Sequence, residues 1–408
     1  MPTEIDITLI DPMHDVTLER ISGTATETRE IPVGLFAPDA PGEYPLVIYS
    51  HGHLGQPSGP AANYAETIAE AGYIVAVPTH LDSTENPPGV VKQFPFGPES
   101  TLHRVADLHH IASSIADLEA VLPGYAIDDG GPVVAGHSHG ARTAMLLAGA
   151  EPGLAAITDL SPDNPYGIEE IALASTAGVI AISPPEPGDG TSPGFEAGSW
   201  SELDVPSLWI TGTEDVVLDG QVCRDRFLGY DEAPDSQKSA AVIEGADHIE
   251  LGGREEALET LDTVTRLAID FLDEAGEYAS AGRTMSDLED VLRDLPALSE
   301  AYSGAEGVLR PVDGTAIGRE TSHDTLLLDE QILSAPRPAG AGFALETSGG
   351  TTLQIESIES IKMTDSSDTT LTLDRSEEAE DIFLFYQTTY DRAPEPAGLG
   401  FWSNILKD

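Results

Sequence analysis

Residues 133–150, VVAGHSHGARTAMLLAGA, place one serine between two glycines where a short apolar run gives way to a helical pattern. The segment from Gly136 to Gly140 matches G-x-S-x-G, with a strand expected before it and a helix after it. Small neighbours allow a strained turn that projects the hydroxyl of Ser138 above the edge of a sheet. The stretch therefore predicts a nucleophile at Ser138. The alternative is an ordinary glycine-rich turn.

The chain between residues 44 and 250 alternates short apolar runs with longer segments of helical period. The apolar runs lack strict alternation, which is typical of strands buried on both faces. Strands of this kind separated by helices predict an α/β fold with a mostly parallel central sheet. The expected strands are 44–52, 73–80, 131–136, 178–185, 205–212 and 239–245, and the expected helices are 62–73, 101–122, 141–150 and 257–275.

The charge of the chain is strongly negative. Its 408 residues include 71 Asp and Glu but only 19 Lys and Arg, a formal net charge of -52. Such a field repels phosphate backbones and anionic lipids, and the chain has no basic stripe for a nucleic acid. We therefore expect neither nucleic acid nor anionic membrane as a partner. An acidic, lysine-poor surface fits a protein that works in high salt or outside the cell.

Cysteine usage and hydropathy exclude several further classes. Cys223 is the only cysteine, so neither an internal disulfide framework nor a cysteine-rich zinc site is expected. The first 20 residues lack a basic segment followed by an apolar one, so we expect no signal peptide. No apolar stretch has the length of a membrane span.

A serine nucleophile needs a base, and the base needs an acid that holds it in the correct tautomer. In the fold that carries G-x-S-x-G, the acid and then the histidine follow later strands. Asp215 lies just beyond the expected strand 205–212, with Glu214 as the alternative acid, and His248 lies beyond the last strand. We predict a triad of Ser138, Asp215 and His248.

Acyl transfer also needs donors for the oxyanion, which this fold takes from the backbone after the nucleophile and after an early strand. Those N–H groups belong to His139 and His53. The pairs His51/His53 and His137/His139 could instead be metal ligands, because imidazole is a common one. No carboxylate or cysteine completes a familiar ligand spacing, so we expect no metal and no other cofactor.

Five segments together resemble the α/β-hydrolases of the dienelactone-hydrolase-like and platelet-activating-factor-acetylhydrolase-like branch over residues 30 to 275. They are YPLVIYSHGHLG, AGYIVAVPTH, VVAGHSHGARTAMLLAGA, VPSLWITGTEDVV and GADHIEL. Dienelactone hydrolase itself has a cysteine nucleophile, whereas relatives with serine cleave carboxylic esters. The resemblance implies esterase chemistry, with Ser138 as nucleophile, Asp215 as acid, His248 as base, and His53 and His139 as oxyanion donors.

The segment 183–206, between two expected core strands, should lie over the site. Phe195 and Trp200 in this segment, together with Leu54, could line an apolar acyl or alcohol pocket. Ordinary packing of the aromatic rings under a loop is the alternative.

The amino-acid composition of the chain changes near residue 302, so we expect a hydrolase domain at 1–300 and an accessory α+β module at 301–408. Gly, Thr, Ser and Asp become frequent, and short alternating runs predict small antiparallel strands. The end, 376–408, is predicted to be helical. Segments 351–374 and 383–406 resemble a module near the ends of bacterial extracellular proteins, many of them exported through a C-terminal signal. The resemblance implies export without a leader, and a halophile's cytoplasm is the alternative.

The sequence thus predicts a serine hydrolase that cleaves carboxylic esters through an acyl-enzyme, with an ester as its partner. A serine peptidase or amidase on the same fold is one alternative. A catalytically inactive extracellular attachment protein is the other. The oligomeric state is left open.

Overall fold

The computed structural model describes residues 2–372 apart from internal gaps. The gaps are 21–22, 88, 91–93, 95–96, 153–165, 169, 186–194, 217–225, 235–237, 279–287, 304–305, 313–314, 318, 320–322, 329–336, 340–341, 359 and 364–369. The chain divides into two compact units, Met1–Met285 and Ser286–Asp408. The boundary lies ahead of residue 300, where the sequence suggested a division.

The first unit is built on a large, mostly parallel sheet, which confirms the predicted α/β class. In this unit the strands follow the order β1-β2-β5-β4-β7-β8-β9-β10, and those from β5 to β10 run parallel. The strands are β4 (Leu46–Ser50), β5 (Ile74–Pro78), β7 (Val133–His137), β8 (Gly178–Ile182), β9 (Ser207–Glu214) and β10 (Lys238–Asp247). Every residue of β4, β5, β7 and β8 is buried, which explains why their sequences show no alternation.

A long antiparallel hairpin precedes this sheet, and the sequence did not predict it. Strands β1 (Thr3–Arg20) and β2 (Gly23–Ala37) pair with a bulge between Asp11 and Asp15, and β2 joins β5. Asp11 and His14 occupy buried positions of β1. Polar residues at inward positions remove the alternation by which a strand is recognised.

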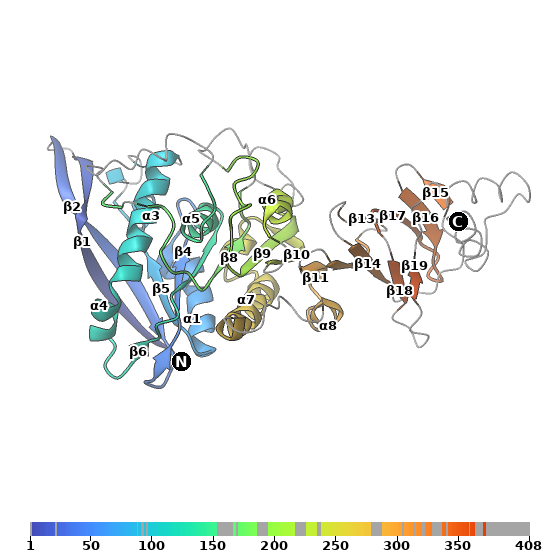
Figure 1. Cartoon of the computed structure of the whole chain (residues 1–408), viewed down its shortest axis with the longest axis horizontal. Helices are drawn as coiled ribbons and strands as arrows, with labels where there is room; N and C mark the ends of the chain where they lie inside the picture. Colours follow the sequence, from blue (N-terminus) through green and yellow to red (C-terminus); the bar gives the residue numbers. More distant parts are fainter. Residues whose placement is uncertain are drawn as a thin grey trace, which may run out of the picture. The chain divides into compact units, whose positions relative to one another are not determined.

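Helices cover both faces of the sheet. They are η1 (Pro57–Ala61), α1 (Ala62–Glu70), α3 (Pro98–Ser113), α4 (Ile115–Ala120), α5 (His139–Leu147), α6 (Leu228–Glu232), η4 (Glu250–Gly252) and α7 (Leu258–Tyr278), with the small strands β3 (Glu43–Tyr44) and β6 (Ala126–Ile127) paired between them. Helix α1 contacts α7, and α3 contacts α5 (Figure 1). The single helix expected at 101–122 is two helices, broken at Ser114.

The order of the strands determines where a site can form. From β4 the chain crosses through α1 to β5 on one side, and from β5 it crosses through α3 to β7 on the other side. Because such crossovers are right-handed, α1 and α3 cover opposite faces. The loops after β4 and β7 therefore diverge at the carboxyl ends of these two strands, which is the place where open α/β sheets form their sites.

The second unit begins with α8 (Leu288–Asp294). Its strands are β11 (Leu298–Ser303), β12 (Glu306–Leu309), β13 (Thr315–Ile317), β14 (His323–Leu328), β15 (Arg337–Ala339), β16 (Gly342–Glu346), β17 (Thr352–Glu356), β18 (Ser360–Met363) and β19 (Thr370–Thr372). Apolar side chains of β12, β14, β16, β17 and β18 share one core.

The expectation of small antiparallel strands in this unit holds for some of the strand pairs and not for others. β14 pairs in parallel with both β12 and β18, and β13 pairs in parallel with β17, whereas β11–β12, β15–β16, β16–β17 and β18–β19 are antiparallel. Alternation shows which face of a strand is buried, but it carries no information about the direction of the neighbouring strand. The helix predicted at 376–408 lies outside the described residues.

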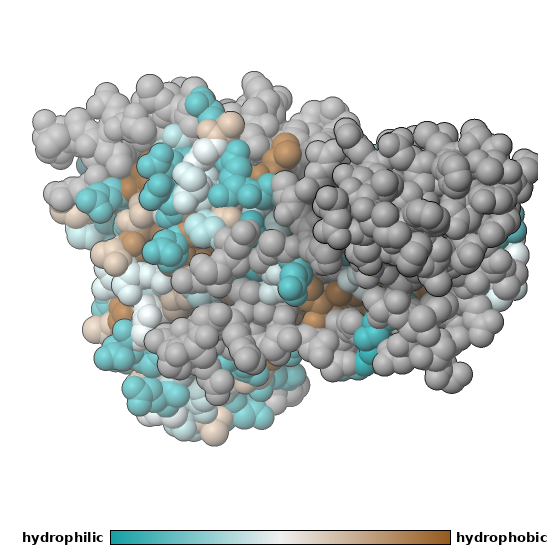
Figure 2. Space-filling model, turned by 45° about the vertical axis from the view of Figure 1, so that its right-hand side comes forward, coloured by the Kyte–Doolittle hydropathy of each residue, from teal (hydrophilic) through white to brown (hydrophobic). Residues whose placement is uncertain are grey.

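On the face shown in Figure 2, the described surface is mostly hydrophilic or intermediate, with small separate hydrophobic groups. Among the helices of the described ranges, none has the length and hydropathy needed to cross a membrane.

Candidate active site

Ser138 occupies the sharp turn between β7 and α5. Its backbone has φ 54° and ψ -117°, a conformation that non-glycine residues rarely adopt. A Cβ on Gly136 would contact the backbone of Gly140, and a Cβ on Gly140 would overlap the carbonyl oxygen of Ser50. The glycines are thus required by close backbone approach, and the strain is localised at the serine.

His248 links this serine to a buried carboxylate. The Nε2 atom of His248 lies 3.1 Å from the Oγ of Ser138, and its Nδ1 lies 2.8 Å from Oδ1 of Asp215. Asp215 is fully buried, whereas Glu214, the alternative acid, is exposed. The structure therefore joins Ser138, His248 and Asp215 in one hydrogen-bonded line and leaves Glu214 outside it.

Asp215 is held as an anion by its surroundings. Thr211 donates its hydroxyl to Oδ2 at 2.8 Å, and Nε of Arg226 lies 2.8 Å from the same oxygen. Burial alone would raise the pKa of the carboxyl, but the hydrogen bond with His248 and the charge of Arg226 lower it. A carboxylate that stays ionised can keep the Nδ1 proton on the imidazole and leave Nε2 free to accept one.

Ser183 also contacts the hydrogen-bonded series of Ser138, His248 and Asp215, and the sequence did not predict it. Its Oγ lies 2.8 Å from Nδ1 of His248, and its hydroxyl also hydrogen-bonds Asp215. The residue is fully buried and has φ 49°. Its sequence signal was its place directly after β8, because the carboxyl ends of parallel strands meet at one edge.

His137 hydrogen-bonds the backbone of His248, the predicted base. Its Nε2 donates to the backbone oxygen of His248 at 2.9 Å, and the two rings lie 4.8 Å apart. Burial lowers the pKa of His137 to about 3, so its ring stays neutral. His137 therefore fixes the backbone that carries the His248 imidazole.

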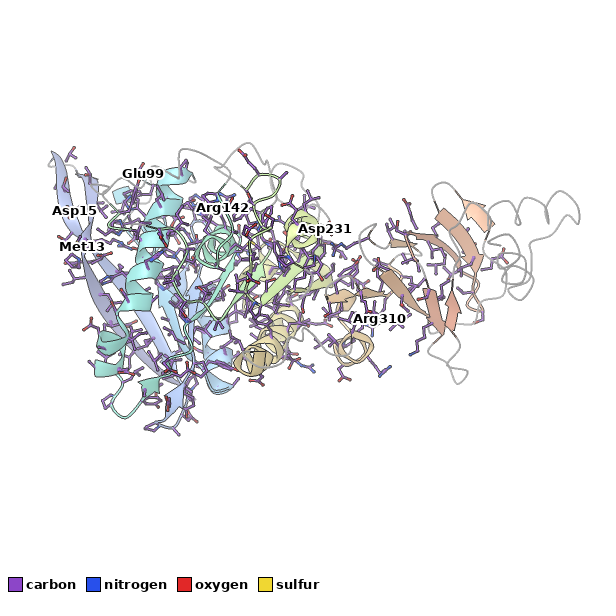
Figure 3. The ribbon with its side chains drawn as sticks, viewed as in Figure 1. Met13, Asp15, Glu99, Arg142, Asp231 and Arg310 are labelled. Atoms are coloured by element: carbon purple, nitrogen blue, oxygen red, sulfur yellow. The ribbon has the colours of Figure 1, made fainter. Side chains whose placement is uncertain are left out.

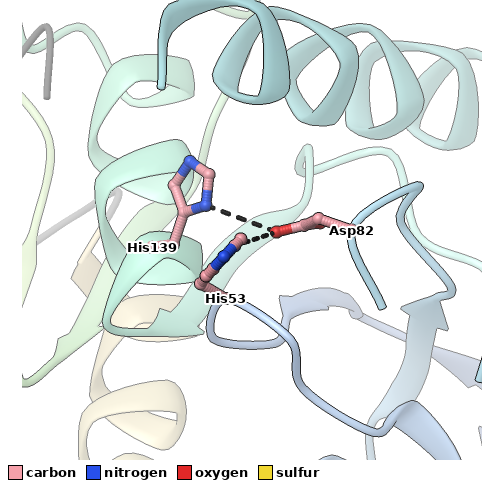
Figure 4. Close-up of side chains that lie close together, drawn as sticks. All are labelled: His53, Asp82 and His139. Atoms are coloured by element: carbon pink, nitrogen blue, oxygen red, sulfur yellow. Dashed lines mark hydrogen bonds and ion pairs between the residues drawn. The ribbon is translucent and has the colours of Figure 1, made fainter. Parts of the chain in front are cut away.

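The side chains of His53 and His139 both point at Asp82, as Figure 4 shows. Nδ1 of His53 lies 2.8 Å from Oδ2 of Asp82, and Nδ1 of His139 lies 3.6 Å from the same oxygen. Arg104 pairs with both oxygens of this carboxylate, at 3.1 and 2.9 Å. The two residues predicted as oxyanion donors therefore lie next to each other, and their rings are engaged elsewhere.

The same cluster bears on the question of a metal. The ligand atoms of His53, Asp82 and His139 lie within 4.8 Å of one another, so Asp82 is the carboxylate that the sequence analysis did not find. Arg104, however, already neutralises Asp82 from 2.9 Å, and a cation there would meet the guanidinium charge. This donor set does not suit a metal ion.

The three residues predicted to line a substrate pocket lie in two different settings. Phe195 and Trp200 are buried, their tilted rings lie 4.4 Å apart, and Trp200 also packs edge to face with Trp209 at 6.2 Å. Leu54, next to His53, is 44% exposed. The aromatic rings thus have packing partners without any ligand, and a role in lining a pocket stays a prediction.

Neither a protein-family model nor a curated protein matches this chain. Among solved structures it is similar to a candidate dienelactone hydrolase from Klebsiella pneumoniae subsp. pneumoniae. That match has 15% sequence identity and a TM-score of 0.41, and it covers 66% of this chain and 99% of the other.

Proposed function

We propose that this chain is a serine hydrolase with an α/β-hydrolase fold and that it cleaves carboxylic esters through an acyl-enzyme. The observation that carries the proposal is the line from Ser138 Oγ through the His248 imidazole to the buried Asp215 carboxylate. A serine hydroxyl becomes a useful nucleophile only when a base can take its proton during attack.

In the first half of the reaction, Ser138 Oγ attacks the ester carbonyl carbon and its proton passes to Nε2 of His248. The carbonyl electrons move onto oxygen, and the backbone N–H groups of His53 and His139 stabilise that oxyanion. Asp215 stabilises the imidazolium without taking its proton. As the oxyanion collapses, the bond between the carbonyl carbon and the ester oxygen breaks, His248 gives its proton to that oxygen so that the alcohol leaves, and the acyl group stays on Ser138.

In the second half, His248 removes a proton from water, and the water oxygen attacks the acyl carbon. The second oxyanion collapses, the bond to Ser138 breaks, and His248 returns the proton to the serine. The carboxylic acid leaves and the enzyme is restored.

The location of the enzyme is part of the proposal. We place it outside the cell because of the resemblance of segments 351–374 and 383–406, and a halophile's cytoplasm is the alternative that the acidic composition also fits.

The test is the hydrolysis of p-nitrophenyl esters by the wild-type chain and by Ser138→Ala. Because the members of such a line act as a unit, we expect kcat to fall by on the order of 10⁴ or more. Circular dichroism should show an unchanged fold, since alanine is smaller than serine. Near wild-type turnover by Ser138→Ala would refute the assignment, and faster cleavage of a matched amide would favour the peptidase alternative.

A further inference from the structure

We infer that the buried Arg104–Asp82 ion pair positions the backbone donors of the oxyanion hole. The pair sets the direction of the His53 N–H, and the Asp82 carboxylate links His53 to His139. The inference rests on the proposed function. Neither residue touches the reacting atoms, so both are positioning residues.

Arg104 comes from α3, which lies beside α5, the helix that starts at His139. Figure 3 labels Glu99 on α3 and Arg142 on α5 and shows these helices next to each other. Arg104 is 1% exposed and donates to the carbonyl oxygens of His51 at 2.6 Å and Gly52 at 3.0 Å. The guanidinium thus holds the loop after β4 in place by hydrogen bonds to its carbonyl oxygens.

The carbonyl oxygen of Gly52 is held by more than this one donor. It also accepts hydrogen bonds from Nδ1 of His51 at 2.7 Å and from the backbone N–H of Gly55 at 3.0 Å. The described chain has no cis peptide bond, and in a planar trans peptide the N–H points opposite to the carbonyl. Fixing the Gly52 carbonyl therefore fixes the direction of the His53 N–H.

Asp82 connects this loop to the nucleophile turn. Its Oδ2 lies 2.8 Å from Nδ1 of His53 and 3.6 Å from Nδ1 of His139. The other ring nitrogen of His139 lies 3.0 Å from the hydroxyl of Thr101 on α3. The rings of both predicted donor residues are thus directed at one carboxylate.

The pair is built to stay charged. Burial alone would raise the pKa of the Asp82 carboxyl, but the charge of Arg104 and the hydrogen bond with His53 hold it well below its usual value. Burial and the charge of Arg104 keep the pKa of His139 well below its usual value, so its ring is neutral. The Asp82–Arg104 ion pair and the neutral His139 ring therefore form a rigid support.

The first variant is Arg104→Lys, which keeps the positive charge but loses the planar fork that reaches Asp82 and two carbonyls together. We expect kcat to fall by about 10² with KM within about twofold, because a misdirected donor weakens only transition-state binding. Affinity for a boronic acid that mimics the tetrahedral intermediate should fall in the same proportion. An unchanged kcat and boronate affinity in a folded variant would overturn the inference.

The matched control is Arg29→Lys. Arg29, on β2, forms a buried ion pair with Asp107 of α3, at 2.8 and 2.9 Å, and its other hydrogen bonds go to the carbonyl oxygens of Glu30 and Thr79. A comparable loss of stability with wild-type kcat is expected there. If Arg29→Lys lowers kcat and boronate affinity as much as Arg104→Lys does, the effect is general destabilisation and the inference fails.

A third variant, His53→Ala, guards against misfolding of Arg104→Lys. The His53 side chain is 27% exposed, and the variant keeps its backbone N–H while losing its tie to Asp82. We expect kcat and boronate affinity to fall together by about 10-fold, since the donor is present but less well held. Wild-type values for both would overturn the inference. If the wild-type chain itself lacks Ser138-dependent hydrolysis, the proposed function fails instead.

Discussion

Two buried Asp–Arg pairs, Asp215–Arg226 and Asp82–Arg104, contact histidines of the proposed site, and they use histidine in opposite ways. In the pair Asp215–Arg226, the carboxylate binds one nitrogen of His248 and leaves the other 3.1 Å from the serine oxygen. In the pair Asp82–Arg104, the carboxylate engages the rings of two histidines whose backbones, in our proposal, do the work.

The difference shows that a histidine near the nucleophile is not defined as a base by its residue type alone. The Nε2 atom of His248, whose side chain is 17% exposed, lies 3.1 Å from the serine oxygen. The His139 side chain is fully buried, and the His53 side chain, although 27% exposed, is engaged by Asp82 through Nδ1. Exposure alone therefore does not separate the two uses either, and the partner of each ring does. The predictions below separate these two uses, starting with the largest effect.

The acid of the first pair should matter most after the nucleophile. We expect Asp215→Asn to lower kcat by about 10⁴, because an amide leaves the imidazole in the wrong tautomer. Steady-state kinetics with a p-nitrophenyl ester measures the loss. Glu214→Gln, at the exposed neighbouring residue, is the control and should keep wild-type kcat. Equal losses for the two variants would contradict the assignment of the acid.

Substitutions of Ser183 should have a smaller effect on kcat, and they separate the cost of backbone strain from the loss of hydrogen bonds. Ser183→Ala and Ser183→Gly both lose the hydroxyl that contacts His248 and Asp215, so both should lower kcat by about 10-fold. Glycine tolerates a φ of 49°, so Ser183→Gly should be more stable than Ser183→Ala by about 1 kcal/mol. Urea unfolding and kinetics measure the two effects. A wild-type kcat in both variants would remove Ser183 from the site.

Buried neutral histidines should make stability, rather than activity, depend on pH. Burial lowers the pKa of His80 to about 4 and the pKa values of His103 and His137 to about 3. Since these groups bind protons in the unfolded chain near pH 6.5 but not in the folded one, stability is complete above that pH and falls below it.

Each of these histidines should cost up to about 1.4 kcal/mol of stability per pH unit between about pH 6 and pH 4. Urea midpoints at pH 7 and pH 5, at constant salt, measure the slope. Carboxylates with lowered pKa values, such as Asp82, contribute only at lower pH. A midpoint that is equal or higher at pH 5 would contradict this interpretation.

The parts of this protein that depend on local geometry were predictable from its sequence. The glycines around Ser138 are dictated by contacts within a few ångströms, so the motif and its flanks predicted the turn, strand and helix. Asp215 and His248 were predictable because residues that follow parallel strands gather at one edge. The choice between Asp215 and Glu214 needed coordinates, because it depends on which side chain enters the core.

The parts that depend on distant partners were not predictable. Arg104 lies on a helix and Asp82 lies in a loop. No local sequence pattern predicts a buried ion pair between them. The hairpin β1–β2 escaped notice because Asp11 and His14 fill inward positions that an amphipathic strand would give to apolar residues.

The most direct test of the account is covalent labelling of the wild-type chain with a fluorophosphonate, followed by mass spectrometry of its peptides. The account predicts one adduct, on Ser138, and its absence in Ser138→Ala and after acid unfolding. Labelling of another serine, or none at Ser138 in an active preparation, would contradict the central claim that His248 and Asp215 make this hydroxyl a nucleophile.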